Sequence, residues 1–583
     1  AGLKVVMCTP TATPPKWLID KYDDVLQLDE QGRPRKFGSR RHYCFNSATY
    51  LEETRRIVNL MAERYGKHEA VGAWQTDNEY GCHDTVRCYC PNCQRAFRTW
   101  LEQKYGSIHA LNEAWWNVFW SMEYNDFSQI ELPNLTTTEA NPSHSLDFYR
   151  FSSDSVIGYN ELQCELIRRS SSYPISHNVM LYFGAFDHFK LAKDLDFVTW
   201  DNYPLGMLEQ SPLPDEVKAH FLRTGHPDLI SLIHDLYYGL KDQPFWVMEQ
   251  QPGQVNWAPS NPIPAKGAVR LWSHQAFGHG ADVVSYFRWR AAVGAQELMH
   301  AGLNRHDGTA DRATTEARQV AGELKAIGQK KAEVALLFDY ENLWATDLQK
   351  HAAGWSYWAL MLSYYQALRS LGLDLTFVHP RSDLSSYKLV LAPALFLLDD
   401  ALASHLETYV SQGGYLVMGP RSGFKTLSNV AQTPAPGPLQ KLMGLTVNNV
   451  DALRPGISET ISREGEKLEY HTWADLYRPT TAETLATYDN PAYEGAAAVC
   501  RQPFGKGACL SIGMWAAPEV LKVFLKPVLE SLSIEIQELP EGIRLARREG
   551  RSYLYNFNPY ELGLELEGFD ATIQAFAVQF KDT

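Results

Sequence analysis

The segment Ala70-Val71-Gly72-Ala73-Trp74-Gln75 leads directly into Thr76-Asp77-Asn78-Glu79. Short apolar runs that end in polar or aromatic residues are typical of parallel strands, whose carboxyl ends meet at one edge of a sheet. The pattern recurs through the first half of the chain, and each run predicts a strand. The runs are Leu3–Met7, Ala70–Trp74, Ile175–Met180, Asp196–Trp200, Phe245–Met248 and Ala281–Tyr286.

Helical patterns lie between several of these strands, for example at Ser47–Tyr65, Cys93–Tyr105 and Phe148–Arg169. Strands that alternate with helices indicate βα units around a parallel sheet, here an α/β fold of the (β/α)8 TIM barrel type. A closed barrel needs eight strands and six are visible, so we expect the first two βα units upstream of Ala1. Ala70–Gln75 is then barrel strand four, and Phe245–Met248 is strand seven.

From Lys331 onward a second series of strands predicts a separate doubly wound α/β domain. After Glu538 the pattern changes to short alternating strands, which predict a small antiparallel β domain. We therefore expect three domains, at residues 1–330, 331–537 and 538–583. The segments behind this division are the strands Ala332–Leu337, Leu389–Leu391 and Gly414–Met418, the helix Gly354–Leu371, and the strands Arg551–Asn556 and Gly563–Glu567.

The composition of the 583 residues restricts the class of partner. Hydrophobic residues make up 45% of the chain, yet no apolar run approaches the ~20 residues of a membrane helix. With 54 Lys and Arg against 68 Asp and Glu, the net charge is -14. This charge disfavours binding to the phosphates of a nucleic acid. We expect neither a membrane nor a nucleic acid as a partner.

Two strand ends carry a glutamate that fits glycoside hydrolysis. Glu79 follows Asn78, whose amide can hydrogen-bond a sugar 2-hydroxyl, and Phe245–Met248 delivers Glu249 in the same way. Carboxyl groups about 5 to 5.5 Å apart favour retention through a glycosyl-enzyme, whereas about 6.5 to 9.5 Å favours inversion. In the retaining case, we expect the charge of Glu249 to raise the pKa of Glu79.

Cysteines cluster at Cys88, Cys90 and Cys93, a spacing that suits a metal better than disulfides. Three thiolates occupy three corners of a tetrahedral zinc, and the fourth ligand comes from Cys82 or Cys44, with His42 and His83 as further candidates. A complete protein ligand set leaves no open position, so this zinc is expected to be structural. The thiols favour a reducing compartment such as the cytoplasm, and no organic cofactor is expected.

Taken together, five segments resemble the glycoside hydrolase family 42 β-galactosidases, and the similarity extends through essentially the whole chain. The combination is far more specific than any single motif. The segments are Gly38–Cys44, Trp74–Gly81, the Cys88, Cys90 and Cys93 triplet, Trp200–Pro204 and Met248–Gly253.

The resemblance implies roles for particular residues. Glu79 corresponds to the general acid/base and Glu249 to the nucleophile, and the second domain is implied to hold a homotrimer together. Eight positions match residues that line the family's galactose site: Arg40, Asn78, Trp120, Tyr203, Trp257, Phe287, Glu297 and His300. The implied zinc ligands are Cys44, Cys88, Cys90 and Cys93, which leaves Cys82 as a spare thiol.

The sequence thus predicts a retaining exo-β-galactosidase that cleaves terminal galactose from small β-galactosides. One alternative is a related retaining enzyme that acts on α-L-arabinopyranosides, whose ring lacks only the hydroxymethyl group. Another is a catalytically silent sugar-binding or assembly protein. A third is hydrolysis at the zinc itself, which predicts loss of chemistry without loss of folding when the metal is removed.

Overall fold

A computed structural model describes residues 2–326 and 328–582. Its first half is built on parallel strands that pair in the order β1-β2-β3 and β4-β5-β6-β7. Only His177 separates β3 from β4, so the two form one interrupted strand, and six strand positions result. The strands are β1 (Val5–Cys8), β2 (Val71–Gln75), β3 (Ile175–Ser176), β4 (Asn178–Val179), β5 (Thr199–Asn202), β6 (Phe245–Gln250) and β7 (Ala281–Tyr286).

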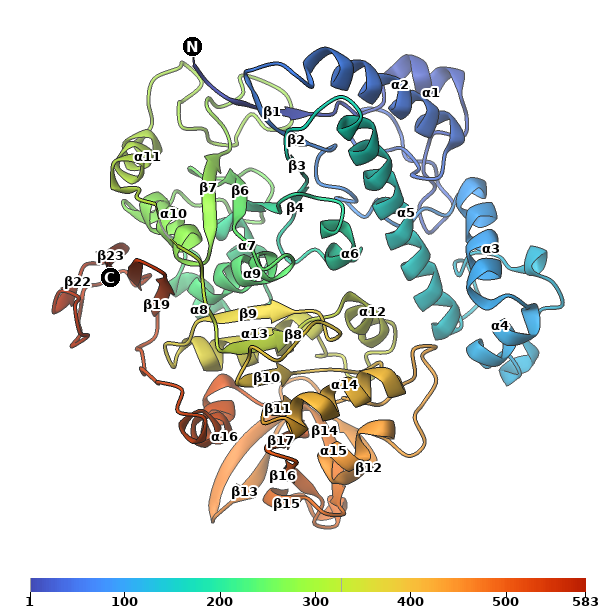
Figure 1. Ribbon diagram of the computed structural model, residues 1–583, viewed down its shortest axis with the longest axis vertical. Coiled ribbons are helices and arrows are strands. Elements are labelled where there is room, and N and C mark those ends of the chain that lie inside the picture. Colours follow the sequence, from blue (N-terminus) through green and yellow to red (C-terminus); the bar gives the residue numbers. More distant parts are fainter. Residues whose placement is uncertain (1, 327, 583) are drawn as a thin grey trace.

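Amphipathic helices cover the outside of this strand arc, which gives the wall of a TIM barrel (Figure 1). Helices α2 (Ala48–Tyr65) and α5 (Pro142–Arg168) pack on each other beside β1 and β2. Ser47 starts α2, because its hydroxyl accepts a hydrogen bond from the Tyr50 N–H at 3.0 Å. Helices α9 (Pro227–Gly239) and α10 (Ala268–Gly278) lie beside the later strands and are buried along nearly their whole length.

The second half contains an 11-stranded sheet whose first part is parallel. Its strand order β9-β8-β10-β11-β17 is the doubly wound order expected from the sequence. The four strands β8–β11 are buried at every residue, which explains their continuous apolar runs. The parallel strands are β8 (Val334–Leu337), β9 (Leu375–Val378), β10 (Leu389–Ala392), β11 (Tyr415–Met418) and β17 (Gly507–Ile512).

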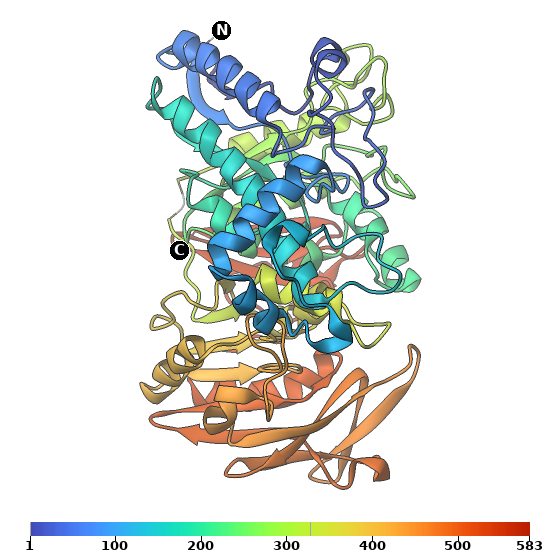
Figure 2. The ribbon, with the colours of Figure 1, turned by 90° about the vertical axis from the view of Figure 1, so that its right-hand side faces the viewer.

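The sheet then continues from β17 into an antiparallel half that the sequence analysis did not anticipate. Figure 2 shows these long, twisted strands at the end of the molecule away from the barrel. They are β12 (Leu445–Ala452), β13 (Ser458–Arg463), β14 (Glu466–Pro479), β15 (Glu483–Tyr488), β16 (Ala497–Phe504) and the short β18 (Met514–Trp515).

The last residues form the expected small antiparallel unit. Strands β19 (Ile543–Arg548), β20 (Arg551–Asn556) and β23 (Ala577–Asp582) form one sheet that packs against α10 of the barrel. A second pair joins β21 (Leu562–Gly563) to β22 (Thr572–Ile573). This unit therefore contacts the barrel directly, although it is distant from α10 in the sequence (Figure 1).

Two helices join the large sheet to the barrel. Helix α12 (Tyr340–Leu348) packs on α5, and α13 (Tyr357–Arg369) packs on α9. Arg150 on α5 bonds the Glu341 carboxylate at 2.6 Å, which ties the two parts together with charge. None of the helices described for residues 2–326 and 328–582 combines the length and apolar character that crossing a membrane requires.

Further helices complete the description. They are α1 (Lys16–Lys21), α3 (Pro91–Tyr105), α4 (Ile108–Trp115), α6 (His188–Ala192), α7 (Pro204–Gln210), α8 (Asp215–His220), α11 (Arg312–Glu323), α14 (Asp400–Ser411), α15 (Gln440–Met443) and α16 (Pro518–Ser531).

Candidate active site

Glu79 lies in a turn that immediately follows β2. Asp77 and Glu79 both have φ near 47°, a left-handed conformation that is costly for residues other than glycine. Side chains fix each backbone N–H of this turn. Asp77 N–H donates to Thr9 Oγ1 (2.6 Å), Asn78 N–H to Asp77 Oδ1 (2.7 Å), Glu79 N–H to Asn178 Oδ1 (3.1 Å) and Tyr80 N–H to His177 Nε2 (3.1 Å). The neighbouring strands therefore hold Glu79 in place.

Three donors converge on one oxygen of the Glu79 carboxylate. Arg40 donates to Oε2 at 3.1 Å, Asn78 Nδ2 donates at 3.2 Å, and Arg41 forms a second ion pair with the same atom. The Arg41 side chain is buried, and its Nε also donates to the Asn78 carbonyl at 3.0 Å. The adjacent arginines thus fix both the carboxylate and the turn that carries it.

Glu249 lies in β6, and the Tyr203 hydroxyl donates to its Oε2. Burial, followed by the charge of Glu79, raises the pKa of Glu249 to about 7. The sequence analysis assigned the raised pKa to Glu79. In the structure two guanidinium groups pair with Glu79, whereas the hydrogen-bond donor to Glu249 among the described residues is a neutral hydroxyl.

A third carboxyl group, that of Asp201, joins the pair from β5. Asp201 is opposite Glu249 in the pairing of β5 with β6, and its Oδ2 accepts a hydrogen bond from Asn178 Nδ2 at 2.8 Å. Burial and the charges of Glu249 and Glu79 raise its pKa well above the usual value. One oxygen from each of Glu79, Asp201 and Glu249 lies within 4.8 Å of the others.

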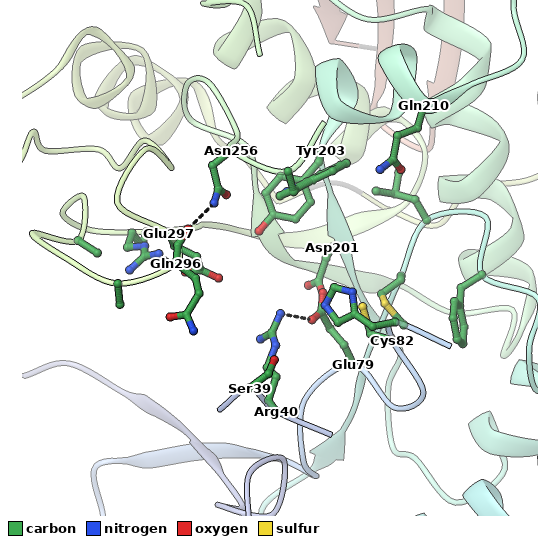
Figure 3. Close-up of a pocket in the computed structure, with 18 of the residues that line it drawn as sticks. Ser39, Arg40, Glu79, Cys82, Asp201, Tyr203, Gln210, Asn256, Gln296 and Glu297 are labelled. Atoms are coloured by element: carbon green, nitrogen blue, oxygen red, sulfur yellow. Dashed lines mark hydrogen bonds and ion pairs between the residues drawn. The ribbon is translucent and has the colours of Figure 1, made fainter. Parts of the chain in front are cut away.

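A cavity of about 990 Å³ opens beside these carboxyl groups, with Glu79 and Asp201 in its lining and Glu249 next to them. Figure 3 shows Asn256, Gln296 and Glu297 on one side of Glu79 and Asp201, with Cys82 and Gln210 on the other side. Arg40, Tyr203, Trp257 and Glu297, four of the expected galactose residues, line this cavity. Asn78 reaches it through its bond to Glu79, and Arg288 pairs with Glu297.

Phe287 and His300 support the cavity from behind Tyr203. The His300 ring lies edge-on to the rings of Tyr203, at 5.6 Å, and of Phe287, at 5.2 Å. His300 is buried, and its Nδ1 contacts the Ala301 carbonyl at 3.1 Å. Neither residue is part of the cavity lining, so in this structure both pack behind Tyr203.

Trp120 lies outside this cavity. It is 69% exposed in a short 3-10 turn, η1 (Phe119–Ser121), where its own φ is 58°. Trp116 and Phe119 are also exposed and stack nearby. Within one chain, therefore, Trp120 does not join the other seven expected galactose residues.

The four cysteines implied by the resemblance do come together. Cys44, Cys88, Cys90 and Cys93 are buried, with sulfur atoms within 4.8 Å of one another. The sulfur of Cys44 lies 3.4 Å from that of Cys93 and 3.5 Å from that of Cys90, close to the ~3.8 Å edge of a tetrahedron with ~2.3 Å metal–sulfur bonds. The Asn46 N–H donates to the Cys44 sulfur at 3.3 Å, a hydrogen bond that favours the thiolate form of this cysteine.

The remaining candidates for the fourth ligand lie elsewhere. Cys82 and His83 line the active-site cavity, and His42 is not part of the sulfur group. All nine cysteines are free thiols. The cluster is therefore suited to hold a metal ion, with Cys44 as the fourth ligand.

Three residues of the site were given no role from the sequence: Asp201, Arg41 and Asn178. Asp201 directly follows the predicted strand Asp196–Trp200, so the strand-end rule that selected Glu79 and Glu249 also applies to it. Arg41 stands beside Arg40, but no sequence signal shows that both side chains reach Glu79. Asn178 lies inside a strand, and only the structure reveals its bonds to Glu79 and Asp201.

Two carboxylates that converge from the ends of strands β2 and β6 of a TIM barrel, beside a cavity of this size, define a glycoside hydrolase. The family model described as beta-galactosidase matches residues 1–327, and the model of the beta-galactosidase trimerisation domain matches residues 332–535. The chain therefore belongs to the β-galactosidases of glycoside hydrolase family 42.

Individual relatives agree with this assignment. The chain is 49% identical to a β-galactosidase of Thermus sp. over 563 residues, which cover 96% of this chain and 85% of the relative. The crystal structure of a β-galactosidase from the psychrophilic Marinomonas ef1 superposes with a TM-score of 0.95 at 43% identity, covering 99% of this chain and 90% of that one. A β-galactosidase of Halorubrum lacusprofundi gives 0.96 at 41% identity, covering 100% and 89%.

Proposed function

We propose that this chain is a retaining exo-β-galactosidase that releases the terminal, non-reducing β-D-galactosyl residue of small galactosides. The observation that carries the retaining mechanism is the approach of the Glu79 and Glu249 carboxylate oxygens to within 4.8 Å. This separation supports direct attack by a carboxylate, because an inverting pair needs about 6.5 to 9.5 Å to admit a water molecule. Membership of the β-galactosidase family supports galactose as the sugar.

In the first step Glu249 Oε attacks the anomeric carbon, and Glu79 gives its proton to the departing glycosidic oxygen. The C–O bond to the leaving group breaks as the bond to Glu249 forms, which produces an α-linked galactosyl-enzyme. In the second step ionised Glu79 takes a proton from water, the water oxygen attacks the same carbon, and Glu249 leaves. Asn78 is positioned to bond the sugar 2-hydroxyl, and Arg40, Trp257 and Glu297 to hold the ring.

Assembly as a homotrimer belongs to the same proposal. The match of residues 332–535 to a trimerisation domain supports it. The exposed position of Trp120 fits this assembly, because its side chain lies at the surface and outside the cavity of its own chain. We divide the chain into units at 1–330, 331–537 and 538–583, with catalysis in the first and assembly in the second.

A structural zinc at Cys44, Cys88, Cys90 and Cys93 completes the proposal. Four buried thiols whose sulfur atoms lie within 4.8 Å of one another support zinc over metals that prefer oxygen ligands. The ion would clip the loop that carries Cys44 to the first turn of α3 and take no part in hydrolysis. The gathering of four cysteines in one metal-type cluster, with a spacing that does not suit disulfides, supports a reducing compartment such as the cytoplasm.

Azide rescue tests the central claim. With an activated aryl β-galactoside, Glu249→Ala is expected to be nearly inactive, and azide to restore turnover with α-galactosyl azide as the product. Glu79→Ala with azide is expected to give β-galactosyl azide instead. Glu52→Ala, an exposed glutamate on α2, serves as the matched control and should keep wild-type activity. Wild-type activity in Glu249→Ala would remove this residue from the mechanism.

A further inference from the structure

The loop that follows β4 forms part of the cavity wall. Met180, Leu181 and Phe183 line the cavity, as do Cys82 beside Glu79 and Gln210 at the end of α7. Phe183 lies on the Cys82 side, because a Cβ atom placed on Gly81 would come within 3.3 Å of its ring. Cys82 and Gln210 lie across the carboxyl groups from Gln296 and Glu297 (Figure 3).

The two ends of the cavity therefore differ in chemistry. The end with Asn256, Gln296 and Glu297 offers polar and charged partners for sugar hydroxyls, whereas the other end offers the Phe183 ring and the Cys82 thiol beside the His83 imidazole and the Gln210 amide. A volume of about 990 Å³ exceeds what a single sugar ring fills. The leaving group, or aglycone, must occupy the second end if Glu79 is to protonate its oxygen.

The outer side of the same loop is held by the second part of the chain. Trp344 on α12 donates its indole N–H to the Gly184 carbonyl at 2.5 Å. Gly184 fits tightly there, since an added Cβ would lie 2.2 Å from Leu343 Cδ2 and 3.6 Å from the indole nitrogen of Trp358. The Tyr182 ring packs edge-on against Trp358 of α13, with ring centres 5.0 Å apart. One loop thus contacts the cavity on one side and helices α12 and α13 on the other.

We infer that Phe183 forms the wall against which the leaving sugar packs, and that Trp344, through its bond to the Gly184 carbonyl, is the residue that positions this wall. The inference rests on the proposed function, since it takes the reaction as galactoside hydrolysis. Helix α12 lies in residues 332–535, which match the trimerisation domain. The domain assigned to assembly therefore also shapes substrate selection in its own subunit.

The test compares two substrates that share galactose and differ in the aglycone. Lactose fills both ends of the cavity, whereas β-galactosyl fluoride has a one-atom leaving group and fills only the galactose end. Phe183→Ala should lower kcat/KM for lactose about tenfold or more and leave kcat/KM for the fluoride within about twofold. Transfer of galactose to added sugar acceptors should fall along with lactose hydrolysis, because the acceptor binds the same subsite.

Trp344→Phe removes only the hydrogen bond to Gly184 and should lower the lactose-to-fluoride ratio of kcat/KM about five- to tenfold. Trp355→Phe is the matched control: Trp355 is equally buried, its indole nitrogen has no partner among the described residues, and it packs on Trp473 and Trp515. This control should leave the ratio unchanged.

A size exchange provides an independent check. Gly184→Ala should lower the ratio because the new methyl group collides with Leu343, and the double variant Gly184→Ala/Leu343→Ala should restore it. If the wild type hydrolyses both substrates but the lactose-to-fluoride ratio of kcat/KM is unchanged in both Phe183→Ala and Trp344→Phe, the inference is wrong. Failure of the wild type on both substrates would instead refute the proposed function.

Discussion

Burial and neighbouring carboxyl groups make the ionisation of Glu249 costly. Glu249 lies in a strand, beside two further carboxyl groups, with a neutral tyrosine hydroxyl as its donor. A retaining hydrolase needs one ionised and one protonated carboxyl at the start of the reaction. The crowding that raises the pKa of Glu249 to about 7 lets the Glu79 and Glu249 pair keep one proton at mildly acidic pH.

The proton shared by Glu79 and Glu249 predicts that kcat/KM depends on pH. As pH rises through about 7 the pair loses the proton that Glu79 must donate, so kcat/KM for lactose should fall. An aryl galactoside with a very acidic phenol as leaving group needs little protonation and should lose much less over the same range. A profile for lactose that stays flat to pH 9 would contradict the assignment. The measurement is kcat/KM against pH for both substrates.

The same raised pKa predicts a cost in stability. A carboxyl whose pKa is raised in the folded state favours folding below the unfolded value of about 4.5, and this contribution is lost as pH rises through about 7. Glu249→Gln should therefore increase the unfolding free energy by on the order of 1 to 3 kcal/mol at pH 8 and by much less at pH 5. Thermal unfolding at both pH values tests this, and an equal effect at pH 5 and pH 8 would refute it.

At the scale of elements, the cysteine cluster and the catalytic turn are linked by a short segment. Arg40 and Arg41 contact Glu79, and Cys44, three residues beyond Arg41, belongs to the sulfur group at the start of α3. The cluster therefore anchors the strand-free segment that places both guanidinium groups. Loss of the cluster should affect the site although no sulfur of the cluster touches it.

Cys44→Ser should lower bound zinc from roughly one ion per chain to a small fraction and decrease the thermal midpoint and kcat together. Cys82→Ser is the control, since Cys82 lies outside the sulfur group and should leave the zinc content unchanged. Elemental analysis, thermal unfolding and lactose kinetics on the same preparations provide the measurement. Loss of zinc with unchanged midpoint and kcat would exclude a structural role.

Sequence patterns predicted the elements of the barrel well. The apolar runs at Ala70–Trp74, Phe245–Met248 and Ala281–Tyr286 became β2, β6 and β7 with small changes at the ends. Helix α5 begins at Pro142, six residues before the predicted start, because Asn141 caps it through a bond to the Ser143 N–H. The antiparallel strands β12–β16 escaped prediction, since several alternate only in part and are specified by partners far away in the sequence.

The convergence of the site depends on the whole molecule, and this explains which site residues could be predicted. Glu79 and Glu249 were found because each ends an apolar run, and that signal is local. Asn178 and Asp201 approach them through strand pairing, and Arg41 approaches Glu79 from a loop. A single sequence displays neither arrangement. The exposed position of Trp120 was not predictable either, because an aromatic residue in a loop carries no sequence signal for burial or exposure.

At the largest scale, a buried ion pair links the carboxyl-terminal sheet to the barrel. Arg544 on β19 binds both oxygens of Asp228 on α9, at 2.7 and 2.5 Å, and Asp228 is fully enclosed. Burial alone would raise the pKa of Asp228, but the charge and hydrogen bonds of Arg544 lower it below the usual value. The pair therefore stabilises the fold above pH about 4, and this contribution is lost as pH falls through the lowered pKa.

Arg544→Ala leaves Asp228 as a buried charge without a partner and should lower the unfolding free energy by about 3 to 5 kcal/mol at neutral pH. Arg547→Ala breaks the half-exposed pair with Asp374, at 3.3 Å, and should cost less than about 1 kcal/mol. Thermal inactivation of both variants, followed by lactose turnover, provides the comparison. Equal losses in the two variants would show that burial of the Asp228 pair has no special effect.

The contact between Gly184 and helix α12 also restricts how the family can diverge. Leu343 fills the space where a side chain at residue 184 would lie, and Trp344 donates a hydrogen bond to the Gly184 carbonyl. A larger side chain at residue 184 therefore needs a smaller one at residue 343. Over evolutionary time the residues at 184 and 343 should drift as a pair, a larger side chain at one accompanying a smaller one at the other. If residues 332–535 were exchanged between distant homologues, the hybrid should therefore acquire part of the donor's aglycone preference as well as its mode of assembly.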